Sequence, residues 1–173
     1  MKKILCILLA AVMMLGFVGC GSSKKEAETT TAPAVAKADI VFKEATYVTL
    51  INDVYNNPNN YLGKVIQIDG MFTSEDFTSQ GGKIYYYVYR QGPGCCGNDG
   101  SMCGFEFTSA DGTYPDYVPK EGDAPAAHPW IKVVGTLEQY YEDQNGQQTG
   151  PFYTLKNATY EVMTTRGAEV VSL

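Results

Sequence analysis

Five strand-like segments separated by glycine and proline turns occupy residues 64–163, and this pattern constrains the fold of the 173-residue chain more than any other feature. The segments are rich in Tyr, Val, Ile, Phe and Thr, which suit a pleated, half-buried surface. The first, "KVIQIDGMFTSE", contains Gly70, where we expect the strand to bend. In the second, "GGKIYYYVYRQ", alternation predicts one face with Ile84, Tyr86 and Val88 and the other with Tyr85, Tyr87 and Tyr89.

The third segment, "GFEFTSADG", is short and ends in a turn. Residues 111–129 then form a proline-rich linker that cannot hold a regular helix. The last two strands form a hairpin over residues 130–163, because the dipeptide Asn145-Gly146 is a strong turn signal between them.

A short helix is predicted before the strands. Tyr47, Leu50, Ile51 and Val54 recur at i, i+3, i+4 and i+7, which is one face of a helix. The following "NNPNN" ends it, since proline restricts the residue before it and cannot continue the ladder. A strand at "TYVTLI" is the alternative. The predicted fold is therefore mainly β: a five-stranded oligonucleotide/oligosaccharide-binding (OB)-like barrel preceded by one short helix, over residues 40–173. An open sandwich is the alternative.

The N-terminus has the pattern of a secretion signal. Lys2 and Lys3 precede the apolar run "ILCILLAAVMMLGFVG", which is shorter than the roughly 20 residues of a membrane-spanning helix. The run ends at "GFVGC", which resembles the lipobox of bacterial lipoproteins. That resemblance implies a signal peptide over residues 1–19 and a diacylglycerol on Cys20. An ordinary signal peptide or a buried apolar helix are the alternatives.

Residues 20–39 would then be the lipidated cysteine and a flexible tether, because "GSSKKEAETTTAPAVAKAD" has no aromatic residue with which to build a core. A coil of this length spans roughly 25 Å. The expected location is the extracytoplasmic side of the cell membrane, with the acylated Cys20 binding membrane lipid. Removal of Lys2 and Lys3 from the chain's 13 basic residues leaves 11 against 19 acidic residues, a net charge of −8. This charge disfavours nucleic acid as a partner and would favour cations or basic partners. The alternative, which we prefer from the sequence, is that the charge serves solubility alone.

Several segments together resemble one family. "NPNNYLGKVIQIDGMF", "YRQGPGCCGNDG", "GFEF", "WIKVVGTLE" and "YTLKNATYEV" are similar to the C-terminal domain of the bacterial YcgQ-like (DUF1980-type) family of uncharacterised membrane-associated proteins. The resemblance covers residues 58–164 and implies an OB-like fold and a permease-type membrane protein as partner. No established catalytic activity comes with it. Its members carry this domain on a multi-spanning membrane segment, whereas this chain has the lipobox, and "CCGNDGSMC" has a further cysteine.

Three cysteines, Cys95, Cys96 and Cys103, remain in the domain. An oxidising compartment permits a disulfide from Cys103 to Cys95 or Cys96, or a vicinal bond between the first two. Alternatively, the three thiolates with Asp99 or His128 would hold zinc or copper(I), although the spacing differs from that of structural zinc sites. Free or redox-active thiols are the third interpretation. Otherwise His128, the only histidine, is expected to be exposed to solvent.

The tyrosines provide a different candidate site. Tyr85, Tyr87 and Tyr89, with the pair "YY" at 140–141, could form an aromatic platform for sugars or bases, or could simply pack the sheet. No phosphate-binding glycine loop, Ser-His-Asp order or H-E-x-x-H motif is present in the sequence. We therefore expect a non-enzymatic binding or assembly module without a required cofactor. The alternative is an envelope accessory protein for metal handling or redox chemistry that uses the cysteine segment.

Overall fold

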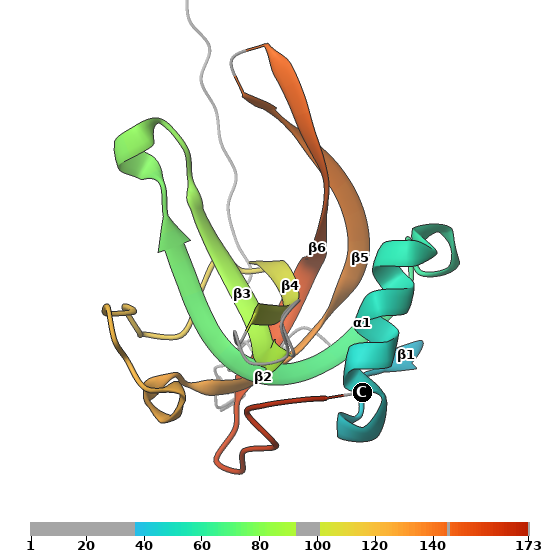
Figure 1. The fold of residues 1–173 in the computed structure, drawn as a ribbon, viewed down its shortest axis with the longest axis vertical. Coiled ribbons are helices and arrows are strands. Elements are labelled where there is room, and N and C mark those ends of the chain that lie inside the picture. Colours follow the sequence, from blue (N-terminus) through green and yellow to red (C-terminus); the bar gives the residue numbers. More distant parts are fainter. Residues whose placement is uncertain (1–36, 93–100, 145, 173) are drawn as a thin grey trace, which may run out of the picture. The chain divides into compact units, whose positions relative to one another are not determined.

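Five strands form a near-closed ring in the computed structural model, which describes residues 37–92, 101–144 and 146–172 (Figure 1). The strands are β2 (Val65–Asp76), β3 (Ile84–Gly92), β4 (Ser101–Ser109), β5 (Trp130–Gln144) and β6 (Gln147–Val162). Their order is β2-β3-β4-β6-β5, and β5 pairs again with β2. Only the β4–β6 pairing in this ring is parallel. The prediction of an OB-like barrel is confirmed, and the open sandwich is wrong.

The strand β2 belongs to both sides of the ring because it bends. Residues 65–71 pair with β5, whereas residues 71–76 pair with β3. At the crossing, a Cβ on Gly70 would lie 2.4 Å from the carbonyl oxygen of Tyr89. Only glycine permits this approach, as expected from its position in the sequence. Figure 1 shows the resulting curvature of β2.

The helix α1 (Tyr47–Asn56) precedes the ring, as predicted, and buries one face against the core. Tyr47 and Val54 are fully buried, and the ring of Phe42 contacts both Tyr47 and Phe105 edge-on. The helix ends at the predicted "NNPNN", where Pro58–Asn60 form a 3-10 turn. A two-residue strand, β1 (Ile40–Val41), pairs in parallel with β2 and was not predicted.

The proline-rich linker covers part of the barrel. Tyr114 stacks on Tyr86 with ring centroids 3.5 Å apart, and Tyr117 packs against Phe72. Its only helical turn is the 3-10 turn Pro125–Ala127, in agreement with the prediction for this fully described segment. In the described part of the chain, no helix is both long and apolar enough to cross a membrane.

Two hairpins extend beyond the ring on the same side in Figure 1. The β2–β3 arm consists of residues 73–87, with pairs from Thr73–Tyr87 to Asp76–Ile84. The β5–β6 arm consists of residues 138–154, with pairs from Glu138–Thr154 to Gln144–Gln147. If β2 to β6 are counted as the five strands of an OB barrel, the β2–β3 arm extends the connection between the first and second strands. The β5–β6 arm extends the connection between the fourth and fifth strands. In OB barrels these two connections flank the face formed by the second and third strands.

Candidate functional site

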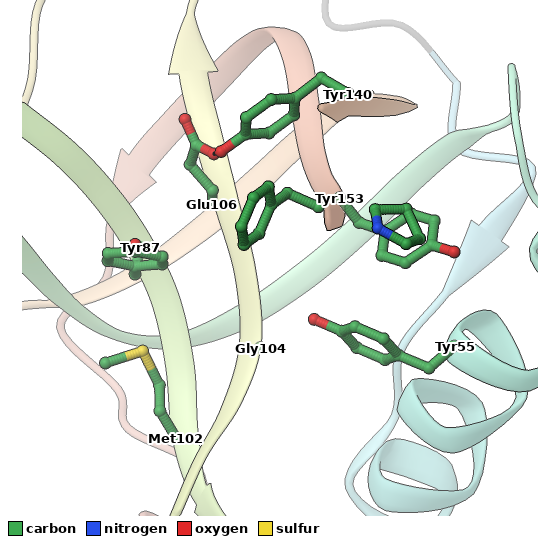
Figure 2. Close-up of a pocket in the computed structure, with 9 residues that line it drawn as sticks. Tyr55, Tyr87, Met102, Gly104, Glu106, Tyr140 and Tyr153 are labelled. Atoms are coloured by element: carbon green, nitrogen blue, oxygen red, sulfur yellow. Dashed lines mark hydrogen bonds between the residues drawn. The ribbon is translucent and has the colours of Figure 1, made fainter. Parts of the chain in front are cut away.

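An aromatic pocket of about 170 Å³ lies along β4 (Figure 2). Four strands and the helix contribute to it. Its lining comprises Tyr55 of α1, Tyr87 of β3, Met102, Gly104 and Glu106 of β4, Tyr140 of β5, and Pro151, Phe152 and Tyr153 of β6. We refer to these nine residues as the aromatic pocket.

Strand alternation determines which β4 side chains reach the pocket. Cys103, Phe105 and Phe107 are buried in the core. Met102 and Glu106 therefore point to the outer face. Gly104 lies between them, and a Cβ there would come within 2.0 Å of the carbonyl oxygen of Val88. The close approach of β3 and β4 at this point requires glycine.

The pocket has rings that remain accessible to a ligand. Tyr55 stacks on Phe105 with centroids 6.3 Å apart and meets Tyr153 edge-on at 5.1 Å. Despite these contacts, Tyr55, Met102 and Phe152 are 51%, 45% and 39% exposed. Most large apolar groups of the barrel are buried in its core. These three residues instead expose apolar surface to solvent, and that surface is available to a ligand.

Two carboxylates lie beside the rings, and each is held by a tyrosine. The hydroxyl of Tyr140 donates a hydrogen bond to Glu106, and that of Tyr85 donates to Glu142 at 2.6 Å. The ammonium of Lys83 lies 3.5 Å from a carboxylate oxygen of Glu106 and 3.9 Å from one of Glu142. This group therefore joins the β2–β3 arm, the floor of the pocket and the β5–β6 arm.

The tyrosine hydroxyls of this group stay protonated at neutral pH. Burial, reinforced by the hydrogen bond to Glu142, raises the pKa of Tyr85 to about 12. Burial and the hydrogen bond to Glu106 also raise the pKa of Tyr140. The pKa of Tyr87 rises through burial and through the nearby negative charges, of which Glu75 contributes most. Both hydrogen bonds to the carboxylates are therefore retained across the physiological range.

The predicted aromatic face is only partly used. Tyr87 lines the pocket, and Tyr85 lies next to it through Glu142 and Lys83. Tyr89 instead packs against the imidazole of His128, with centroids 5.9 Å apart, and does not line the pocket. The alternation of faces itself is as predicted. Of the pair at 140–141, Tyr140 lines the pocket and Tyr141 does not.

Of the residues predicted to form a thiol or metal site, Cys103 and His128 lie in the part of the chain that the structure describes. Cys103 lies in β4 opposite Arg90, not in a loop, and is a free buried thiol among the described residues. His128 is buried and not exposed as expected, because its Nδ1 lies 3.0 Å from the carbonyl oxygen of Phe72 and its ring packs on Tyr117.

These two residues do not form a common site. His128 packs on Tyr89, and Tyr89 pairs with Gly104 of β4. Because side chains alternate along a strand, Cys103, the residue before Gly104, points to the opposite face of the sheet. Within the described ranges, no three His, Cys, Asp or Glu side chains are grouped as for a metal ion. Cys20, Cys95, Cys96 and Asp99 lie outside the described residues, so the lipid anchor, the disulfide and a metal site at the other cysteines stay predictions.

Sequence reasoning missed several residues of this region. Lys83, Glu106 and Glu142 are distant in sequence, and only the closed ring and its two arms bring them together. Phe152 and Met102 were not singled out either. The one available signal was the tyrosine-rich composition of "YYYVY" and "YY", which indicated the correct face of β3 and one residue of β5.

Comparison with known proteins gives a family and nothing closer. No curated protein and no solved structure matches the chain. Residues 18–164 match the family described as the DUF1980 C-terminal domain. This match covers most of the sequence, including the barrel with its aromatic pocket. The chain belongs to the DUF1980 C-terminal domain family.

Proposed function

We propose that this protein is an extracytoplasmic lipoprotein whose OB-like barrel is a non-enzymatic binding module, with the aromatic pocket as its ligand site. The observation that carries the proposal is the position of the pocket. It lies on β4 and β3, and residues of both hairpin arms line it: Tyr87 of the β2–β3 arm, and Tyr140 and Phe152 of the β5–β6 arm. OB barrels bind extended ligands on this face and with these connections.

The size of the pocket supports recognition of part of a larger ligand. About 170 Å³ is less than the roughly 300–1,000 Å³ of a pocket that encloses a drug-sized molecule. One ring or one long side chain fits, while the rest of the ligand would lie along the arms. The exposed Tyr55 and Phe152 provide the stacking surface for that group.

The anchor part of the proposal rests on the N-terminal sequence. Lys2 and Lys3, the apolar run and "GFVGC" together have the order of a lipoprotein signal. A diacyl modification of Cys20 would provide the two chains that stable attachment needs. A membrane protein of the permease type is the partner that the family resemblance implies, and the barrel would present the aromatic pocket to it or to its substrate.

Binding is tested with the purified mature chain against an array of soluble peptides and oligosaccharides. The ligands found are then measured by calorimetry with Phe152→Ala and with Tyr141→Ala as the matched control. Tyr141 is on the same arm and 50% exposed but does not line the pocket. Loss of one stacking ring weakens binding about tenfold or more in Phe152→Ala, while Tyr141→Ala stays within about twofold. Equal effects of the two substitutions would place the ligand elsewhere.

Anchoring is tested in cells of a bacterial host. The wild-type chain incorporates an alkyne-labelled fatty acid and sediments with membranes. Cys20→Ala removes the acceptor thiol, and the label is lost. If the wild-type chain is not labelled and is released in soluble form, it is not a lipoprotein. The proposal for the binding site would not be changed by that result.

A further inference from the structure

We propose that the aromatic pocket and its two flanking carboxylates bind a lysine- or arginine-bearing segment of a partner protein. This inference rests on the proposed function and deepens it, because it names the chemistry of the ligand. The site consists of the exposed rings of the aromatic pocket and an adjacent cage for a positive charge. The cage is made of Glu106, Glu142, Tyr85 and Tyr140.

The cage already holds a cation from the chain itself. The ammonium of Lys83 lies 4.5 Å from the ring centroid of Tyr85 and 5.0 Å from that of Tyr140. It also lies within 4 Å of Glu106 and Glu142. Two aromatic faces and two carboxylates around one ammonium are the arrangement that cation–π and ionic contacts favour.

Lys83 is held loosely, whereas the carboxylates are fixed. The Lys83 side chain is 54% exposed, while those of Glu106 and Glu142 are 9% and 23% exposed. Because Lys83 is exposed, water can solvate its ammonium when a ligand cation replaces it, and this exchange leaves neither carboxylate unpaired. The hydroxyls of Tyr85 and Tyr140 keep both carboxylates in place during the exchange. The cage is therefore preorganised for a replacement cation.

The charge around the pocket favours the same class of ligand. The β2–β3 arm, β4 and the β5–β6 arm carry one basic residue, Lys83, and six acidic ones: Glu75, Asp76, Glu106, Glu138, Glu142 and Asp143. An acidic surface of this kind repels phosphate and carboxylate ligands and attracts basic ones.

The rings adjacent to the cage suit the rest of a basic side chain. The aliphatic stems of lysine and arginine pack on apolar surface while their charged ends stay polar. Glu106 and Tyr140 belong both to the cage and to the lining of the aromatic pocket. A ligand side chain can therefore lie along the exposed Tyr55, Met102 and Phe152 while its neighbour on the same segment places a charge in the cage.

The test is calorimetry of the full mature chain with tetralysine, with neutral chitotetraose and with tetraglutamate. The variants are Glu106→Gln, Glu142→Gln and Lys83→Met. Glu138→Gln is the matched control, since it removes the same charge from an exposed residue that lies outside the cage, on the arm that also carries Glu142. Glutamine keeps an acceptor for the tyrosine hydroxyl, and thermal unfolding of each variant confirms that it is folded.

We expect tetralysine to bind and its affinity to fall as salt is raised. Glu106→Gln and Glu142→Gln each weaken it about tenfold, the size of a lost charge-assisted hydrogen bond, while Glu138→Gln changes it less than about threefold. Lys83→Met strengthens tetralysine binding severalfold because the competing ammonium is gone, which a purely structural role of Lys83 would not produce.

The other outcomes overturn the inference in distinguishable ways. If tetralysine does not bind, or if Glu106→Gln and Glu142→Gln bind it as well as the wild-type chain does, the cation cage is refuted. Binding of chitotetraose or tetraglutamate with sensitivity to Phe152→Ala refutes the cationic ligand but leaves the proposed binding function standing. If no ligand of the array or of this set is sensitive to Phe152→Ala, the proposed function fails together with the inference.

Discussion

Replacement of Arg90 by methionine should destabilise the barrel much more than the same replacement of Arg166. Arg90 is only 2% exposed and connects three parts of the fold. It donates to the carboxylate of Asp69 at 3.0 Å and to the carbonyl oxygen of Ala168 at 3.1 Å, and its guanidinium lies 4.7 Å from the ring of Tyr47.

The magnitude follows from what remains after the substitution. Removing one partner of a buried ion pair costs about 3–5 kcal/mol, because the other charge is left unpaired. The side chain of Asp69 is 27% exposed, and Trp130 still donates to it at 3.2 Å, so water and the indole compensate in part. We expect Arg90→Met to lower the free energy of unfolding by about 3 kcal/mol.

Arg166 is a matched control because both guanidinium groups lie 5.0 Å from the ring of Trp130. The Arg166 side chain is 29% exposed and pairs with the partly exposed Glu169. It also donates to the carbonyl oxygens of His128 and Pro125, so its loss should cost about 1–2 kcal/mol. The assay is urea unfolding followed by the fluorescence of Trp130, the only tryptophan, and by circular dichroism. A difference of less than about 1 kcal/mol between the two variants would refute the role of Arg90 as a buried connection.

Three further predictions concern the barrel and its titratable groups. Gly104→Ala should cost at least about 2 kcal/mol, because its Cβ would lie 2.0 Å from the carbonyl oxygen of Val88; an unchanged urea midpoint would contradict this. Burial raises the pKa of Cys103, so iodoacetamide at pH 8 should label its peptide in the reduced chain far more slowly in the native than in the unfolded state. Equal labelling rates by mass spectrometry would be inconsistent with a buried thiol. The pKa of Tyr85 is raised to about 12 from the usual 10, so its contribution to stability is complete below pH 10 and is lost as the pH rises from 10 to 12. Tyr85→Phe should therefore lose less stability than wild type between pH 9 and pH 11 in urea titrations, and an equal or larger loss would rule out this contribution.

The local elements were predictable because each depends on neighbouring residues. The spacing of Tyr47, Leu50, Ile51 and Val54 predicted α1. The helix buries three of them, Tyr47, Ile51 and Val54, together with Val48, while Leu50 is only partly buried. Alternation in "IYYYVY" correctly separated the core-facing Tyr86 from the outer Tyr87. The number of strands and their turns then left few topologies, among which the OB barrel was the best candidate.

The site was less predictable because it depends on ring closure. The carboxylate of Glu106, on β4, meets Lys83 and Tyr140 only because β4 pairs with both β3 and β6. The burial of His128 likewise depends on the backbone of Phe72, which is far away in sequence. No local pattern indicates either contact. The sequence did indicate that Cys103 is close to a strand, but alternation could not be applied to it until the start of β4 was known.

The most direct test of the binding face uses the methionine methyl groups as reporters. Met102 lines the aromatic pocket and is 45% exposed, whereas Met71 is fully buried. In the mature chain labelled with [methyl-13C]methionine, the two signals are assigned from Met102→Leu and Met71→Leu and followed during titration with tetralysine. We expect the Met102 signal to shift to saturation while the Met71 signal stays in place. A ligand that binds without moving the Met102 signal would contradict the assignment of the aromatic pocket as the binding site.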